Sequence, residues 1–126
     1  EFELRRKRGA HLFSKHRYLS AQVQGYLRDG VWKRAAEATN AKAARMIKGL
    51  RAVPAFEFLF EPAANMIFGT LPRAIHRRLL DAGARYELHG DLEGPGEARL
   101  GMRLVVGWSV DDADIDRFVD IAAGKP

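Results

Sequence analysis

Apolar residues recur every three or four positions along the first half of the chain. Between residues 12 and 27 this period predicts an amphipathic helix, and Gly30 suits a left-handed cap at its end. The same period continues from Trp32 to Leu50 in an alanine-rich segment, and Pro54 marks the end of this second helix. The first half of the chain therefore predicts two consecutive helices, each with one apolar stripe.

The period changes to two after the second helix. Phe56, Phe58 and Phe60 alternate with other residues, which predicts a strand. Further apolar runs predict strands at residues 65–71, 84–90 and 101–108. The segment "GDLEGPGEARLG", residues 90–101, is rich in glycine and predicts a loop.

Two helical patterns interrupt and follow these strands. In the first, residues 70–83, Thr70 is the expected cap, Pro72 the expected first-turn residue and Gly83 the end. In the second, residues 109–124, Ser109 and Asp112 are spaced as a capping box. The expected buried stripes are Ile75, Leu79 and Leu80 in the first helix, and Ile115, Phe118, Val119 and Ala122 in the second. This order of elements predicts an α/β fold, with a small, mostly antiparallel sheet and helices packed on one face.

Composition narrows the classes of protein and of site. The chain has 126 residues, of which 47% are hydrophobic, enough for a packed core in one domain of ordinary size. The absence of cysteine excludes disulfides, thiolate metal sites and cysteine nucleophiles. No apolar run approaches the ~20 residues of a membrane span, and the four histidines lack metal-ligand spacing, so we expect no membrane partner and no metal.

The net charge of +5 is unevenly distributed. Residues 1–51 hold 13 Lys and Arg against 4 Asp and Glu, whereas residues 52–126 hold 8 against 12. A basic half attracts phosphates or acidic surfaces, or it pairs with acidic residues elsewhere in the same protein. One hypothesis is therefore a stand-alone basic module that binds nucleic acid or an acidic partner. The run "RRKR" lacks the interleaved aromatic residues that stack on bases, which disfavours nucleic acid.

Arg103 lies within the apolar run "MRLVVGW". Burying a guanidinium is costly unless an anion pairs with it. One interpretation is an exposed position on an edge strand, or a structural partner among Asp111, Asp112 and Asp114. The other is a planar fork that binds a carboxylate with two hydrogen bonds.

Lys15 and Arg17 pose the same choice at the start of the first predicted helix. Basic residues at a helix N-terminus oppose the helix dipole. They are either solvated or accompanied by a bound anion.

Four segments carry a resemblance to a known family, in the same order and over essentially the whole chain: "LRRKRGAHLFSKHRYLSAQVQGYLRDGVWKRAAEATNAKAARM", "EPAANMIFGTLP", "LLDAGARYEL" and "MRLVVGW". The chain resembles the C-terminal part of the low-specificity L-threonine aldolase / β-eliminating lyase family. The resemblance implies a pyridoxal 5'-phosphate (PLP) enzyme of fold type I, similar to aspartate aminotransferase. It also implies that the chain forms the small C-terminal domain.

The family implies a domain arrangement. Residues 1–30 would form a basic helix at the domain junction and subunit interface, and residues 31–126 the small C-terminal α/β domain. The large PLP-binding domain with the Schiff-base lysine is expected to be absent from this chain, because no lysine here has its glycine-rich, strand-end context. The segment alone is therefore predicted inactive, and the whole enzyme is expected to be a cytoplasmic homo-oligomer, a dimer or tetramer with its active site at the interface.

The family also implies roles for three residues. Arg17 would lie near the cofactor phosphate, with Lys7 as a second basic residue there, and Arg103 would bind the substrate's α-carboxylate. No catalytic residue is expected in this segment. The implied reaction is carbon–carbon cleavage of a β-hydroxy-α-amino acid, L-threonine, to glycine and an aldehyde. The two arginines also suit a related β-eliminating lyase.

Overall fold

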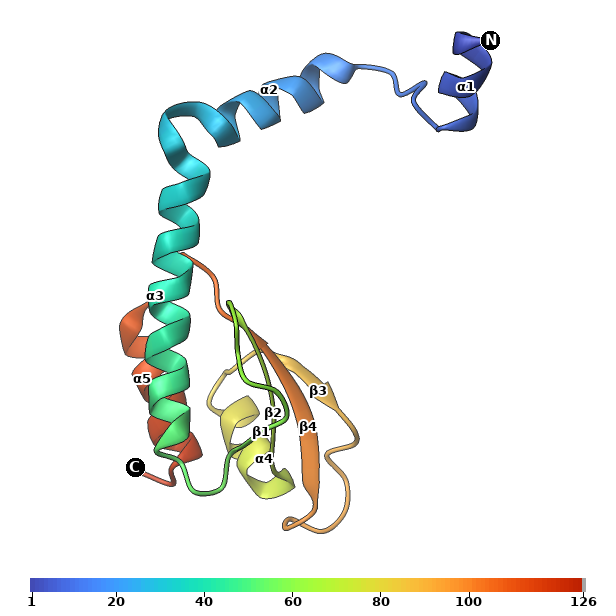
Figure 1. The fold of residues 1–126 in the computed structure, drawn as a ribbon. Coiled ribbons are helices and arrows are strands. Elements are labelled where there is room, and N and C mark those ends of the chain that lie inside the picture. Colours follow the sequence, from blue (N-terminus) through green and yellow to red (C-terminus); the bar gives the residue numbers. More distant parts are fainter. Residues whose placement is uncertain (126) are drawn as a thin grey trace. The chain divides into compact units, whose positions relative to one another are not determined.

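The computed structural model describes residues 1–125, which form two compact units (Figure 1). The first unit, Glu1–Arg34, contains α1 (Phe2–Arg8), α2 (His16–Leu27), the 3-10 turn η1 (Arg28–Gly30) and the start of α3 (Val31–Arg51). The second unit begins at Ala35 and contains the rest of α3, all four strands and two further helices. Among the described residues, no helix combines the length and hydropathy needed to cross a membrane.

The second unit is built on a four-stranded sheet. The strands are β1 (Glu57–Phe58), β2 (Met66–Pro72), β3 (Glu87–His89) and β4 (Arg99–Val105), and the helices that follow β2 and β4 are α4 (Arg73–Asp81) and α5 (Asp112–Ala122). Their spatial order is β1-β2-β4-β3, and every neighbouring pair is antiparallel. The strand that carries Arg103 is therefore internal, so the interpretation of an edge strand is wrong.

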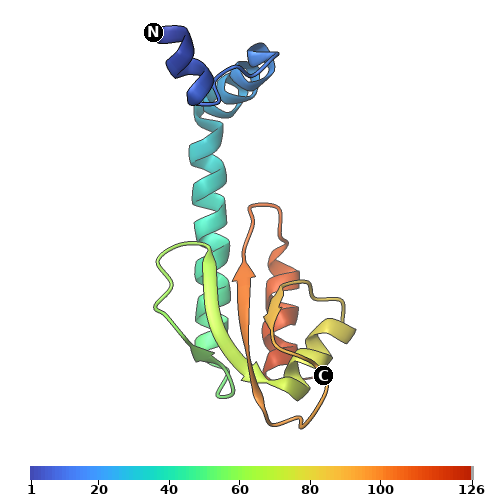
Figure 2. The same cartoon turned by 90° about the vertical axis from the view of Figure 1, so that its right-hand side faces the viewer.

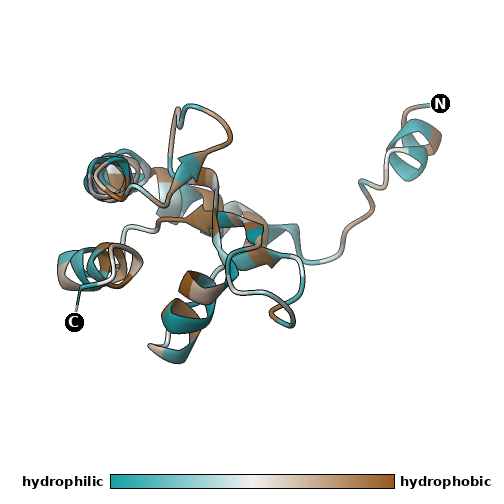
Figure 3. Ribbon diagram, turned by 90° about the horizontal axis from the view of Figure 1, so that it is seen from below, coloured by the Kyte–Doolittle hydropathy of each residue, from teal (hydrophilic) through white to brown (hydrophobic). Residues whose placement is uncertain are grey.

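Helices cover one face of this sheet (Figure 2). The period of two in β2 and β4 directs Ile67, Leu71, Met102 and Leu104 to that face, where all four are buried. They pack with apolar residues of α3, α4 and α5, including Met46, Leu50, Leu79, Ile115 and Phe118. Individual helices and strands therefore carry both hydrophobic and hydrophilic residues (Figure 3). The predicted α/β class, with helices on one face of a small antiparallel sheet, is confirmed.

Charged residues of α3 and α5 pair across the outside of the helical layer. Arg45 donates from Nε and Nη2 to the two carboxylate oxygens of Asp116, at 2.8 and 2.6 Å, and Lys42 Nζ lies 3.2 Å from Asp112 Oδ1. The hydrogen bond between Arg45 and Asp116 lowers the pKa of Asp116 and raises the pKa of Arg45. Part of the basic first half is thus paired with the acidic second half, as one of the sequence interpretations proposed.

The first predicted strand is much shorter than its pattern indicated. Only Glu57 and Phe58 pair with β2, opposite Thr70 and Gly69. After the last bond, from Leu59 N to Phe68 O, the chain turns away towards Pro62. The Phe60 side chain is consequently exposed instead of continuing the alternation.

Three predicted helix starts are wrong. Thr70 lies inside β2, where its hydroxyl accepts a hydrogen bond from Arg99 Nε at 2.9 Å, and α4 begins after Pro72. The last helix begins after Asp111 with no side-chain cap, so the Ser109 capping box does not form. The first predicted helix begins at residue 16, because Lys15 has a left-handed backbone with φ of 65°. The short helix α1 was not predicted.

His76 is a fully buried polar residue in the core. Its Nε2 lies 3.1 Å from the carbonyl oxygen of Leu100, and its Nδ1 lies 2.9 Å from the hydroxyl of Tyr86. Since a carbonyl only accepts, Nε2 carries the proton and Nδ1 accepts from the tyrosine. Burial lowers the pKa of His76 and raises the pKa of Tyr86 well above its ordinary value, so both groups are neutral at physiological pH.

We expect this buried pair to make stability depend on pH. With a folded pKa below the unfolded value of ~6.5, His76 contributes stability that is complete above that value and declines as pH falls below it. His76→Phe should lower the free energy of unfolding by about 1–3 kcal/mol near pH 8, because Tyr86 loses its acceptor. The difference in the free energy of unfolding between His76→Phe and wild type, measured by urea unfolding, should become smaller from about pH 8 to about pH 5. A constant gap would contradict the prediction.

Candidate functional site

The face of the sheet opposite the helices is the candidate site. Within the described residues no helix of the second unit covers this face, as the views in Figures 1 and 2 agree. The residues of β2 and β4 that alternate with the core positions point to it, among them Phe68 and Arg103. Phe68 and Arg103 are half-buried, whereas their neighbours on the helical face are buried. A polar side chain here can meet a ligand without disrupting the core.

Arg103 lies in the middle of this open face. The register pairs it with Phe68 on β2 and with Glu87 on β3. The Glu87 carboxylate forms an ion pair with Nη2 of Arg103, and its other oxygen lies 3.1 Å from Nε2 of His89. The side chains of Arg103 and Glu87 are 40% and 48% exposed, so the pair is accessible. The expected alternative partners, Asp111, Asp112 and Asp114, do not contact Arg103 within the described residues.

The Nε atom of Arg103 is buried and has no hydrogen-bond partner among the described residues. An unsatisfied buried donor costs about 1–3 kcal/mol. The guanidinium is therefore only partly satisfied by this chain. It can accept a further anion at its accessible end, which is what binding a carboxylate requires.

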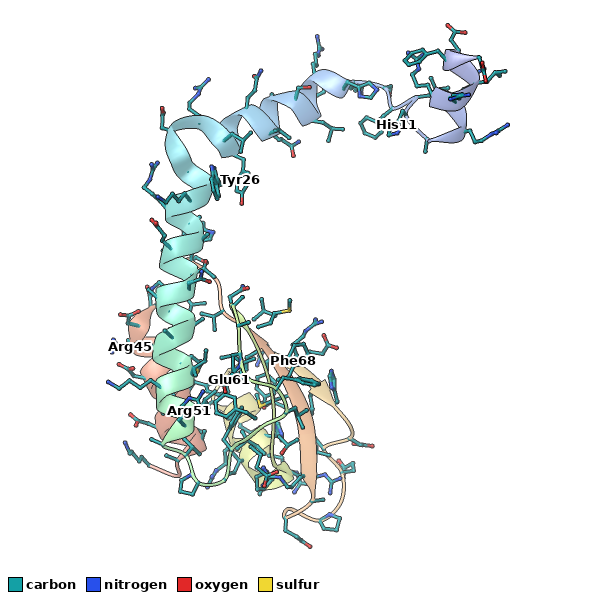
Figure 4. The ribbon with its side chains drawn as sticks, in the orientation of Figure 1. His11, Tyr26, Arg45, Arg51, Glu61 and Phe68 are labelled. Atoms are coloured by element: carbon teal, nitrogen blue, oxygen red, sulfur yellow. The ribbon has the colours of Figure 1, made fainter. Side chains whose placement is uncertain are left out.

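Aromatic residues border Arg103 on the β2 side. Phe60 contacts Phe68 edge to face, with 5.8 Å between ring centroids. Phe68 and the nearby pair of Arg51 and Glu61 are labelled in Figure 4, and that ion pair joins the end of α3 to the loop that holds Phe60. The open face thus places the Arg103 guanidinium beside an apolar wall. This combination suits a small ligand with a carboxylate and an apolar part.

A separate apolar cavity of about 310 Å³ lies between α4, α5 and the end of β4. It is lined by core residues such as Leu79, Ile115 and Phe118, with Arg85 and Arg117 also contributing. None of the three predicted site residues lines it.

Arg17 and Lys7 lie in the first unit. Arg17 is the second residue of α2, and its guanidinium contacts the neighbouring Tyr18, with 3.4 Å between Nη2 and the hydroxyl and 5.1 Å from Cζ to the ring centroid. Lys7 is in the last turn of α1 and is exposed. Neither pairs with a carboxylate among the described residues, and no contact joins them. Arg17 thus lies at the N-terminus of α2, which has no side-chain cap.

The first unit has no core of its own. Every residue of Glu1–Arg34 is exposed except Gly30, which is half-buried. Leu19, Val23, Tyr26 and Leu27 form an apolar stripe on α2, each with roughly half of its surface exposed. An apolar stripe of this size normally marks a surface that packs against another part of a protein.

Sequence reasoning missed Glu87, although it identified Arg103. The strand containing Glu87 was predicted, but its register against β4 depends on pairings between distant residues that no local pattern specifies. The alternation of Glu87 and His89 with apolar Leu88 was the available signal of a polar face.

Comparison with known proteins shows which proteins this chain is similar to. No family model matches the chain. The low-specificity L-threonine aldolase of Pseudomonas sp. (strain NCIMB 10558) is 30% identical over 115 residues. The match covers 91% of this chain and 31% of the length of that relative.

Solved structures give the same fold at lower identity. The threonine aldolase of Leishmania major superposes with a TM-score of 0.64 at 21% identity, over 80% of this chain and 28% of that one. The cystine C-S lyase C-DES gives a TM-score of 0.62 at 20% identity, over 82% and 27%. A Sphingomonas wittichii serine palmitoyltransferase gives 0.55 at 17%, over 70% and 23%. The fold is therefore that of the small domain of fold-type-I PLP enzymes, as predicted, and the predicted resemblance to a low-specificity L-threonine aldolase is confirmed over 91% of this chain.

Proposed function

We propose that the chain is the C-terminal part of a PLP-dependent lyase that cleaves β-hydroxy-α-amino acids, L-threonine among them, to glycine and an aldehyde. The observation that carries the proposal is the 30% identity to a low-specificity L-threonine aldolase across 91% of the chain. The chain spans 31% of that relative, so the activity belongs to the whole protein and not to this segment. We assign the Schiff-base lysine and the large cofactor-binding domain to the remainder.

Arg103 is proposed to bind the substrate's α-carboxylate. Its accessible guanidinium on the open face supports this role. A guanidinium that holds the carboxylate fixes the orientation of the bond between Cα and Cβ, which must align for cleavage. When bound, pyridoxal phosphate supplies the electron sink for the electrons released by that cleavage. The contribution of Arg103 is thus to bind and orient.

Arg17 and Lys7 are proposed to hold the phosphate of the cofactor. Their lack of an acidic partner within the described residues and the position of Arg17 at a helix N-terminus support this assignment. Residues 1–30 would then form the junction with the large domain and with a second subunit of a cytoplasmic homo-oligomer, and residues 31–126 the small domain. The exposed stripe on α2 supports such a junction.

The activity test uses the whole protein that contains this chain. With bound PLP and L-threonine it should release glycine and acetaldehyde in equal amounts, measured by amino-acid analysis and by enzymatic reduction of the aldehyde. Release of ammonia and a keto acid instead would indicate a β-eliminating lyase and contradict the proposal.

Arg103→Ala in the whole protein should raise KM for L-threonine and lower kcat/KM by about ten- to a hundred-fold, since a charge-assisted bond worth about 1.5–3 kcal/mol is lost. The absorbance of the bound cofactor should not change. Arg78→Ala, which replaces an exposed arginine of α4, is the matched control. Kinetics like those of wild type would remove Arg103 from the site.

Arg17→Ala should weaken cofactor retention by about tenfold, because one charge-assisted contact to phosphate is lost. Lys7→Ala should act in the same direction. The dissociation constant of PLP is measured by absorbance after dialysis, with Arg28→Ala at the other end of α2 as the control. Equal retention by the Arg17 and Arg28 variants would contradict the assignment.

Val23→Glu should disrupt the oligomer, because it places a charge in the centre of the apolar stripe of α2. Ala21→Glu, on the opposite side of α2, should leave the mass unchanged. Light scattering measures the molecular mass of the oligomer in each variant. The same mass for both would exclude this stripe from the subunit interface.

A further inference from the structure

Glu87 and Arg103 form an ion pair on the open face of the sheet. Two residues at matched positions of β3 and β4 place opposite charges side by side on the open face. One carboxylate oxygen of Glu87 forms an ion pair with Arg103 Nη2, and the other lies 3.1 Å from His89 Nε2. The carboxylate is therefore held from both sides on a short strand.

Glu87 alone orients the guanidinium. Nε of Arg103 has no acceptor, and within the described residues no other carboxylate, backbone carbonyl or hydroxyl contacts the group. By contrast, Arg99 on the same strand is fixed by Thr70 Oγ1 and by two backbone carbonyls, each at 2.9 Å. The orientation of Arg103 thus depends on one cross-strand contact.

Glu87 also competes with any carboxylate that binds Arg103. Its negative charge already neutralises the guanidinium, and an incoming carboxylate would share that guanidinium with a like charge. Because the pair is about half exposed, water screens both the attraction and the repulsion, so the effect is moderate.

We propose that Glu87 is a positioning residue that aims Arg103 and limits the affinity of the site for carboxylates. This inference rests on the proposed role of Arg103 in binding the substrate. The site should therefore bind amino acids with a single carboxylate, and bind them weakly, because each bound carboxylate competes with that of Glu87 for Arg103.

Two substitutions separate the two effects. Glu87→Gln keeps an acceptor for Arg103 but removes the charge, so it should tighten carboxylate binding by about two- to fivefold. Glu87→Ala removes both the charge and the acceptor, which leaves the guanidinium free to reorient. It should therefore have a lower kcat/KM than Glu87→Gln. Glu93→Gln, an exposed acidic residue of the loop after β3, is the matched control.

The measurements are made on the whole protein. Steady-state kinetics give KM and kcat for L-threonine, and line broadening of the acetate methyl signal in NMR gives a dissociation constant that needs no turnover. For Glu87→Gln we expect both KM and the acetate constant to fall while kcat stays within about twofold.

Unchanged or higher constants in Glu87→Gln would overturn the affinity-limiting role. Equal kcat/KM in the Gln and Ala variants would overturn the positioning role. Either failure leaves the proposed function intact if Arg103→Ala still impairs binding of L-threonine and acetate. If Arg103→Ala binds both normally, the proposed role of Arg103 fails and this inference fails with it, whereas the proposed lyase activity fails only if the whole protein does not release glycine and acetaldehyde.

Discussion

The burial of one face of the sheet is the constraint on which the other features depend. The apolar residues of β2 and β4 that alternate along each strand are packed under three helices. Because side chains alternate across a strand, the residues between them must face the other way. Shifting β4 by one residue would bury Arg103 and expose Met102, which is far more costly than any contact on the open face. The core therefore fixes the position of the candidate site.

A few residues determine the charge and polarity around Arg103 on the open face. Arg103 supplies the cation, Glu87 supplies its partner, and Phe68 borders it on the other side. A rigid sheet is a good support for such a group, since its backbone positions are held by hydrogen bonds on both sides. Water and a ligand can reach the exposed end of the guanidinium, which reduces the energetic cost of its unpaired donor.

Local patterns predicted the parts of the structure that depend on local interactions. The long helix α3, the strand β2 and the covered face of the sheet follow from periodicity, and Arg103 was singled out because a charge in an apolar strand needs an anion. The pairing of Glu87 with Arg103 depends on strand order, which is set by contacts between distant residues. His76 was not expected in the core, because its two partners, Tyr86 and Leu100, are brought together only by the fold. The Thr70 cap failed since strand pairing extended through that residue.

In the first unit the apolar stripe of α2 and the side chains of Arg17 and Lys7 are exposed. The central claim, however, concerns Arg103, and a crystal structure of the whole protein with glycine bound tests it most directly. The account predicts the glycine carboxylate within hydrogen-bond distance of the Arg103 guanidinium, with Glu87 still in contact with Nη2. A glycine carboxylate bound by other residues, with Arg103 paired to Glu87 alone, would contradict it.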